Sequence, residues 1–167
     1  MKAIVPGSFD PITLGHINII ERASKMFDTV YVAVMNNDSA KYDDRLKSKN
    51  YMLTPEERLK VVELSIAHIE NAKPIYFEGM LIDACDKLSA YAVIRGVRDS
   101  KDFEYELIHA KWNREHNEKI EVFFMPADPR FDTISSSMVK EKIQVGDHLD
   151  DLVGALHPDA IEFLKNR

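Results

Sequence analysis

The chain has 167 residues, which is enough for one domain with a proper core and too few for two comfortable ones. Its formal net charge of −6 argues against sequence-independent nucleic-acid binding, which needs a basic surface, although a few local cations can still hold a small phosphate ligand. The N-terminus turns polar too early for a signal peptide, and no apolar run approaches the ~20 residues of a membrane span. We therefore expect a cytoplasmic protein without a nucleic-acid or membrane partner.

Strand-like and helix-like segments alternate along the chain. Strands are predicted where β-branched and aromatic residues gather, at residues 2–5, 29–35, 73–77, 90–95 and 120–125. Helical patterns lie between and after them, near residues 16–26, 54–69, 80–88, 102–116, 136–145 and 158–165. The second helix opens with a capping box in "TPEE", with Thr54 as the N-cap and Glu57 closing it. The alternation predicts an α/β fold in one domain, residues 1–167, with a doubly wound, five-stranded parallel sheet of Rossmann-like type.

Ligands of a doubly wound sheet bind beyond the carboxyl ends of its strands, so the motifs that follow strands are the informative ones. The first is "GSFDPITLGH", between the first predicted strand and helix. Gly7 and Gly15 let a ligand approach the main chain, and Ser8 offers a hydroxyl beside the turn. His16 sits at a helix start, where free N–H groups favour an anion. On composition alone, a turn capped by Thr13 with an exposed histidine is an equal alternative.

Two further motifs follow later strands. Arg95 and Arg98 flank Gly96 after the fourth predicted strand, and their planar forks suit phosphate oxygens. The alternative is that these arginines pair with acids such as Asp99 and Asp102. Three serines in "FDTISSSMVKE" open a predicted helix, although N-capping needs only one. Their hydroxyl and N–H groups suit the oxygens of a phosphate.

The remaining candidates for chemistry carry weaker signals. The other five histidines have no metal-ligand spacing, and we interpret them as ordinary surface or packing residues. Cys85 is the single cysteine, which excludes an internal disulfide and a cysteine-based zinc cluster. Because it sits in the apolar helical pattern "MLIDACDKL", we expect a buried, inert thiol.

The motifs together resemble the nucleotidylyltransferase superfamily, in the form carried by the phosphopantetheine adenylyltransferases. "PGSFDPITLGH" is similar to the T-x-G-H signature, and Thr13 stands where many relatives outside this subfamily have a histidine. The resemblance runs along nearly the whole chain, in the family's order, through "RASKMFD", "LTPEERL", "IRGVRDSKDFEYE" and "ISSSMVKE". It implies the nucleotidylyltransferase fold and transfer of AMP from ATP to 4′-phosphopantetheine, which gives dephospho-coenzyme A and pyrophosphate in coenzyme A biosynthesis.

The resemblance also implies roles for individual residues. His16 would stabilise the transition state, with Arg98 and a loop lysine as further catalytic groups. ATP would lie along Ser8, Phe9, His16, Gly96, Val97, Arg98, Glu106, Phe131, Asp132, Thr133, Ile134, Ser135, Ser136 and Ser137. Thr133 departs from the family, whose members commonly have an aromatic residue there. Phosphopantetheine would contact Ser8, Leu81, Arg95 and the loop lysine.

The loop lysine has two candidate positions. Counting forward from "VAVMNNDSAKY" places the family's lysine at Ala40, one residue before Lys41, whereas counting backward from "LTPEER" places it at Lys49. We favour Lys49, because the backward count meets a well-matched block without a gap.

The implied reaction needs no general base, because a phosphate monoester with a second pKa of about 6 is largely ionised at neutral pH. It needs in-line positioning and relief of charge, with Mg²⁺ as cofactor, bound through ATP rather than by protein ligands. The family implies a homohexamer.

Two alternatives to this function stay open. One is a related nucleotidylyltransferase with another phosphate acceptor, such as nicotinamide mononucleotide. The other is a non-catalytic nucleotide-sensing module.

Overall fold

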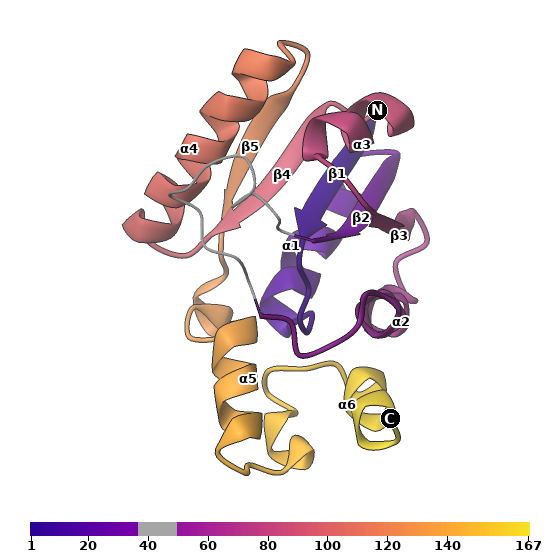
Figure 1. Ribbon diagram of the computed structural model, residues 1–167, viewed down its shortest axis with the longest axis vertical. Helices are drawn as coiled ribbons and strands as arrows, with labels where there is room; N and C mark the ends of the chain where they lie inside the picture. Colours follow the sequence, from indigo (N-terminus) through magenta and orange to yellow (C-terminus); the bar gives the residue numbers. More distant parts are fainter. Residues whose placement is uncertain (37–49) are drawn as a thin grey trace.

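Five parallel strands form one sheet, with helices on both of its faces (Figure 1). The computed structural model describes residues 1–36 and 50–167. The strands follow the order β3-β2-β1-β4-β5 and are β1 (Lys2–Gly7), β2 (Thr29–Met35), β3 (Ala72–Phe77), β4 (Ala92–Val97) and β5 (Glu121–Pro126). The helices are α1 (Leu14–Ser24), α2 (Pro55–Ile66), α3 (Leu81–Leu88), α4 (Ser100–His116), α5 (Ser136–Gln144) and α6 (Pro158–Lys165). The predicted doubly wound, five-stranded parallel sheet is confirmed.

The order in which strands are added to the sheet reverses once. It adds β2 and β3 on one side of β1 and then returns to add β4 and β5 on the other side. The strand order therefore reverses between β1 and β4, and a crevice at the carboxyl ends of these two strands is the expected ligand position.

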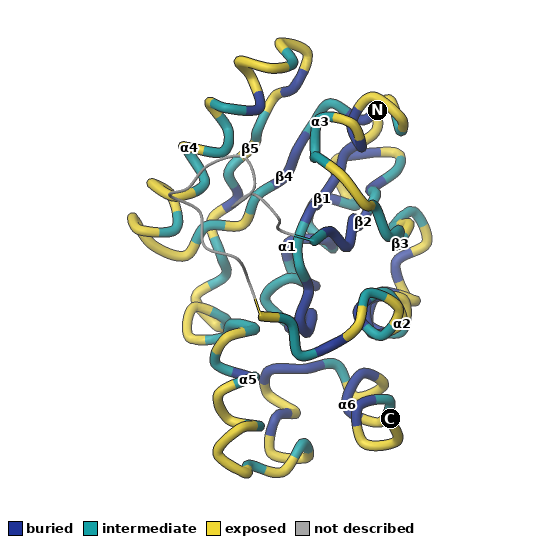
Figure 2. The backbone as a smooth tube through the Cα atoms, viewed as in Figure 1, coloured by how far each residue is buried: buried dark blue, intermediate teal, exposed yellow. Residues whose placement is uncertain are grey.

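Two apolar layers hold the helices against the sheet (Figure 2). Strand β2 shows why, because its residues alternate between the faces: Val30, Val32 and Val34 join one layer, and Ala33 and Met35 join the other. The first layer includes buried residues of α1, α2 and α6, and the second includes those of α3. Helix α4 packs along β4 and β5 and beside α3.

Local sequence signals account for the starts of α1 and α2. The predicted capping box of α2 is present: Glu57 N–H donates to Thr54 Oγ1 at 3.2 Å, and Thr54 N–H donates to Glu57 Oε2 at 2.8 Å. The first helix begins at Leu14 rather than at residue 16, because Thr13 is its N-cap. Two short 3-10 helices, η2 (Pro129–Phe131) and η3 (Leu149–Leu152), were not predicted.

Three findings concern the thiol, metal-binding side chains and membrane-spanning helices. Cys85 is fully buried, as predicted, and burial together with the nearby Asp86 charge raises the pKa of its thiol to about 12, which disfavours the reactive thiolate. Over residues 1–36 and 50–167, no three histidine, cysteine or acidic side chains are grouped as a metal site. In the same residues, no helix has both the length and the apolar character that crossing a membrane requires.

Gly7 is required by the side chain two residues after it. Phe9 has a positive φ of 46°, and its ring folds back over the end of β1. A Cβ at position 7 would lie 2.8 Å from Phe9 Cζ, closer than packed atoms allow. The Phe9 ring is itself buried and lies edge-on to His16, with 5.3 Å between ring centroids. Gly7 therefore makes room for the buried Phe9 ring next to the β1–α1 loop.

We expect Gly7→Ala to lower the free energy of unfolding by about 1–3 kcal/mol, because the buried Phe9 ring has to move. Gly154→Ala is the matched control, since a Cβ at position 154 meets nothing within 4 Å and should change stability by less than about 0.5 kcal/mol. Urea unfolding of the three proteins measures both values. Equal stability of the Gly7→Ala and Gly154→Ala variants would contradict the packing constraint.

Candidate active site

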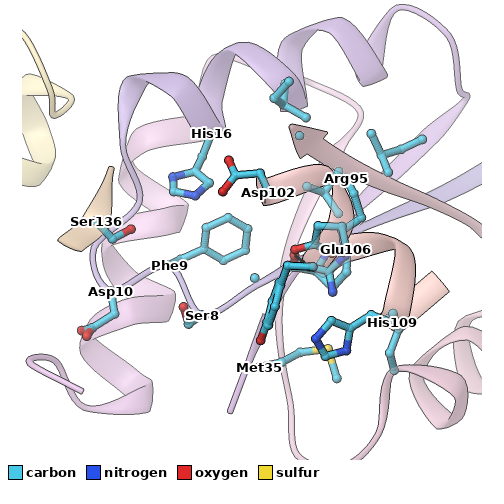
Figure 3. A pocket seen from close by; sticks show the side chains of 18 of the residues that line it. Ser8, Phe9, Asp10, His16, Met35, Arg95, Asp102, Glu106, His109 and Ser136 are labelled. Carbon is cyan, nitrogen blue, oxygen red and sulfur yellow. Dashed lines mark hydrogen bonds and ion pairs between the residues drawn. The ribbon is translucent and has the colours of Figure 1, made fainter. Parts of the chain in front are cut away.

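A cavity of about 910 Å³ opens at the carboxyl ends of β1 and β4, where the strand order reverses. The loop between β1 and α1, the end of β4, one side of α4 and the start of α5 line it. Figure 3 shows side chains from these elements, including His16, Arg95 and Ser136, around the same space. The structure thus brings together the three sequence motifs that follow strands.

His16 is held by the cap of its own helix. Its Nδ1 lies 3.1 Å from the backbone N of Thr13 and 2.8 Å from Thr13 Oγ1. A backbone N–H can only donate, so Nδ1 accepts this hydrogen bond and is not protonated. The neutral imidazole therefore carries its proton on Nε2. Donation from Nε2–H to an anionic oxygen does not require a charged ring.

The two arginines of the second motif are already paired with acids of α4. Arg98 binds Asp102 through two nitrogens, Nε at 2.6 Å and Nη2 at 3.0 Å. These hydrogen bonds lower the pKa of Asp102 and raise that of Arg98. Arg95 Nη1 donates to the carbonyl oxygen of Pro6 at 3.0 Å, and Arg95 Nε lies 3.0 Å from Glu106 Oε2. A guanidinium has five N–H donors, so both arginines retain capacity for phosphate oxygens.

The three serines divide their work. Ser135 is the N-cap of α5, and its Oγ accepts from Met138 N–H at 3.1 Å. Ser136 Oγ donates to the carbonyl oxygen of Pro11 at 2.8 Å, which ties α5 to the β1–α1 loop. Ser137 is exposed at the cavity wall. Of the two serines that capping does not need, Ser136 thus has a structural role. The hydroxyl hydrogen of the capping residue, Ser135, can still be donated to a ligand.

The structure places most of the other predicted site residues at this cavity. Its lining includes Ser8, Phe9, Leu81, Gly96, Glu106, Phe131 and Ile134. Val97, Asp132 and Thr133 do not line it, and their contacts with a ligand stay predictions. Lys41 and Lys49 lie outside the described residues.

Close packing explains the glycine at position 96 but not the one at position 15. A Cβ at Gly96 would lie 3.1 Å from Ile19 Cγ1, so glycine lets β4 approach α1 closely. A Cβ at Gly15 would make ordinary contact with Phe131 at 3.5 Å. Phe131, from the segment before α5, thus packs against the start of α1.

Sequence reasoning missed two buried charges beneath the cavity. Arg58 of α2 is fully buried, and its Nη1 donates to the carbonyl oxygens of Ser8 at 2.9 Å and Met35 at 3.2 Å. Asp10 is 1% exposed and accepts from Lys140 Nζ at 3.0 Å. A signal for Arg58 existed in the sequence, because it occupies a core-facing position of α2, in register with Val61, Val62, Ser65 and Ile66.

Comparison with known proteins defines the class first. A family model described as cytidylyltransferase-like matches residues 4–142. The fold is similar to the crystal structure of a putative nicotinate-nucleotide adenylyltransferase from Vibrio parahaemolyticus, with a TM-score of 0.69 and 20% sequence identity over 99% of this chain and 91% of that one. At this identity the likeness concerns the fold alone. The class is a nucleotidylyltransferase domain.

Curated relatives define the family more narrowly. The phosphopantetheine adenylyltransferase of Staphylococcus carnosus is 38% identical over 96% of this chain and 92% of its own length. That of Staphylococcus saprophyticus is 40% identical over 91% of this chain and 89% of its own length. The chain therefore belongs to the phosphopantetheine adenylyltransferase family, and it is an enzyme of the nucleotidyltransferase class.

The hydrogen bond from Thr13 N–H predicts the tautomer of His16. We expect nitrogen-15 NMR of the histidine side chains at neutral pH to show His16 protonated at Nε2 and unprotonated at Nδ1. His16→Ala identifies the signal by its loss, and His148→Ala, at an exposed position, serves as the assignment control. A proton on Nδ1 of His16 would show that the cap does not fix the ring in solution.

Proposed function

We propose that the protein transfers AMP from ATP to 4′-phosphopantetheine, which gives dephospho-coenzyme A and pyrophosphate in coenzyme A biosynthesis. The observation that carries the proposal is the cavity at the strand reversal, where His16, two arginines and the start of α5 meet. The identity of 38% to 40% with phosphopantetheine adenylyltransferases, over nearly the full length of the chain, supports this acceptor.

The chemistry is attack of a phosphate oxygen on the α-phosphorus of ATP, with pyrophosphate as the leaving group. The attacking monoester is largely ionised at neutral pH, so the protein does not have to remove a proton from it. The protein's task is to hold the reacting groups in line and to stabilise the charge that moves onto the α-phosphate and the leaving group. As a fixed hydrogen-bond donor, His16 suits the α-phosphate. Arg98 and the N-terminus of α5 suit the other phosphates.

Mg²⁺ belongs to this proposal as a cofactor carried by the nucleotide. Mg²⁺ at nucleotide sites is usually held by substrate phosphates and water, with few protein ligands. When bound, the ion would neutralise charge on the triphosphate.

The acceptor separates this proposal from its alternatives. A related nucleotidylyltransferase would use another phosphate acceptor, such as nicotinamide mononucleotide, and a nucleotide-sensing module would turn over neither. The arginines, His16 and the serine helix start are all present, although a sensor has no need of charge-stabilising groups. These features favour the enzyme over the sensor.

We expect pyrophosphate release from ATP with 4′-phosphopantetheine and none above background with nicotinamide mononucleotide. His16→Ala should lower kcat by orders of magnitude and change ATP affinity far less, because its contact strengthens in the transition state. His148→Ala is the matched control for loss of a histidine. Turnover of nicotinamide mononucleotide, or of neither acceptor, would support the corresponding alternative.

The two arginines should affect different substrates. Arg95→Ala should mainly raise KM for phosphopantetheine, and Arg98→Ala should mainly raise KM for ATP, each by roughly ten- to a hundredfold from the loss of a charge-assisted contact. Arg114→Ala is the control, because Arg114 of α4 pairs with Glu121 away from the main cavity. Exchange of the two effects would show that the substrate assignments are reversed.

Two elements of the proposal extend beyond the described contacts. A homohexamer stays a prediction, supported by apolar side chains that are 40% to 48% exposed on α4 and β5, including Phe103 and Phe123, and testable by the mass in solution. The loop lysine stays a prediction at Lys49, with Lys41 as the alternative.

A further inference from the structure

A buried carboxylate joins three separate segments at the edge of the cavity. Asp10 lies in the β1–α1 loop and accepts hydrogen bonds from the backbone N–H groups of Met52 and Leu53, each at 2.9 Å, just before α2. Its third partner is Lys140 Nζ of α5, at 3.0 Å. Almost all of the carboxylate is removed from water, so these three donors replace its hydration.

Helix α5 is fastened to the β1–α1 loop at two points on one of its faces. Ser136 Oγ donates to Pro11 O at 2.8 Å, and one turn later Lys140 binds Asp10, the residue before Pro11. Residues four apart lie on the same side of a helix. The two contacts therefore fix both the rotation of the first turn about the helix axis and its position along that axis. That first turn follows the Ser135 cap directly.

The same loop leads into His16. Only two residues separate Asp10 from Thr13, the cap of α1, and Thr13 holds the His16 ring through Nδ1. A shift of α5 against this loop therefore changes the position of the serines relative to His16. Catalysis by positioning is sensitive to such shifts, since a displacement of about 1 Å can cost a hundredfold in rate.

We propose that Asp10 and Lys140 form a positioning pair, which sets the first turn of α5 against the His16 loop and thereby aligns the nucleotide phosphates for transfer. Asp10 and Lys140 both line the cavity. Because each is already bound by the other, the pair acts through the serines and His16 rather than by contact with the substrate. This inference rests on the proposed adenylyltransferase function for its catalytic consequence. The two contacts that tie α5 to the β1–α1 loop do not depend on the proposed function.

The chain offers variants that separate alignment from folding. Asp10→Asn keeps a side-chain oxygen for the N–H groups of Met52 and Leu53 but turns an N–H₂ group toward Lys140. Lys140→Gln removes the cation and leaves the loop contacts in place. Lys142→Gln is the matched control on the same helix, because Lys142 pairs with Asp147 at 3.1 Å and lies outside the cavity.

Steady-state kinetics with both substrates, at a temperature where every variant is folded, is the first measurement. We expect Lys140→Gln and Asp10→Asn each to lower kcat by about ten- to a hundredfold, with KM changed by less than about threefold. The double variant should lose no more than the worse single variant, because the two residues act as one unit. Lys142→Gln should keep the wild-type kcat. A wild-type kcat in Lys140→Gln, or additive losses in the double variant, would overturn the proposal.

A rise in KM for ATP with kcat intact in Lys140→Gln would also overturn it, because that result would mean that Lys140 binds the substrate directly. Amide hydrogen exchange without substrate is the second measurement. We expect Met138 and Val139 to exchange at least about tenfold faster in Lys140→Gln than in Lys142→Gln. Unchanged exchange would overturn the tie itself. An inactive wild-type protein with the expected exchange would instead refute the proposed function while the tie stands.

Discussion

A single guanidinium, buried beneath the cavity, holds together the ends of the neighbouring strands β1 and β2. Arg58 reaches from α2 to the carbonyl oxygens of Ser8, after β1, and Met35, at the end of β2, and its Nη2 binds Asn36 Oδ1. Its guanidinium also lies 4.3 Å from the centre of the Tyr51 ring. Burying a charge is costly, and these strand ends offset part of that cost by supplying acceptors to Nη1 and Nη2. Among the described residues, the buried Nε of Arg58 has no hydrogen-bond partner. The β1–α1 loop, and with it His16, is placed relative to this anchor.

Asp10 complements this arrangement with the opposite charge. Arg58 contacts Tyr51, and Asp10 accepts from the next two backbone N–H groups, so the segment before α2 is held from both sides. Neither charge neutralises the other directly, since each is satisfied mainly by main-chain groups or by a third residue. Polar contacts as well as apolar packing therefore hold together the segments beneath the cavity. These contacts are formed within the protein, so they hold the β1–α1 loop in place before a ligand arrives.

The sequence predicted local features well and tertiary partners poorly, for a physical reason. The strands, the Thr54–Glu57 capping box and the buried Cys85 depend on patterns within a few residues, and all three are confirmed. The position of the cavity followed from strand order, because parallel strands bring their carboxyl ends to one edge. The contacts of Asp10 cross more than forty and more than a hundred residues of sequence, and no local pattern specifies such partners.

The serine run shows the same limit at one site. Its excess over capping was visible in the sequence, and phosphate binding was the natural interpretation. The structure adds that Ser136 donates to Pro11, a contact across 125 residues. The arginines differ, because pairing of Arg98 with Asp102 was foreseen as an alternative: the two residues are four apart on the chain. What decided predictability was sequence separation, rather than the chemistry of the residue.

The acids beside the arginines have a consequence for catalysis under the proposed function. Both substrates are anions, and a cavity of unpaired cations would bind their phosphates strongly before reaction as well as during it. Such uniform binding lowers KM without raising kcat. Asp102 on Arg98 and Glu106 beside Arg95 moderate this ground-state attraction. His16 adds a neutral Nε2–H donor beside these paired arginines, so it can donate to an oxygen on which negative charge builds without adding a further full positive charge to the cavity.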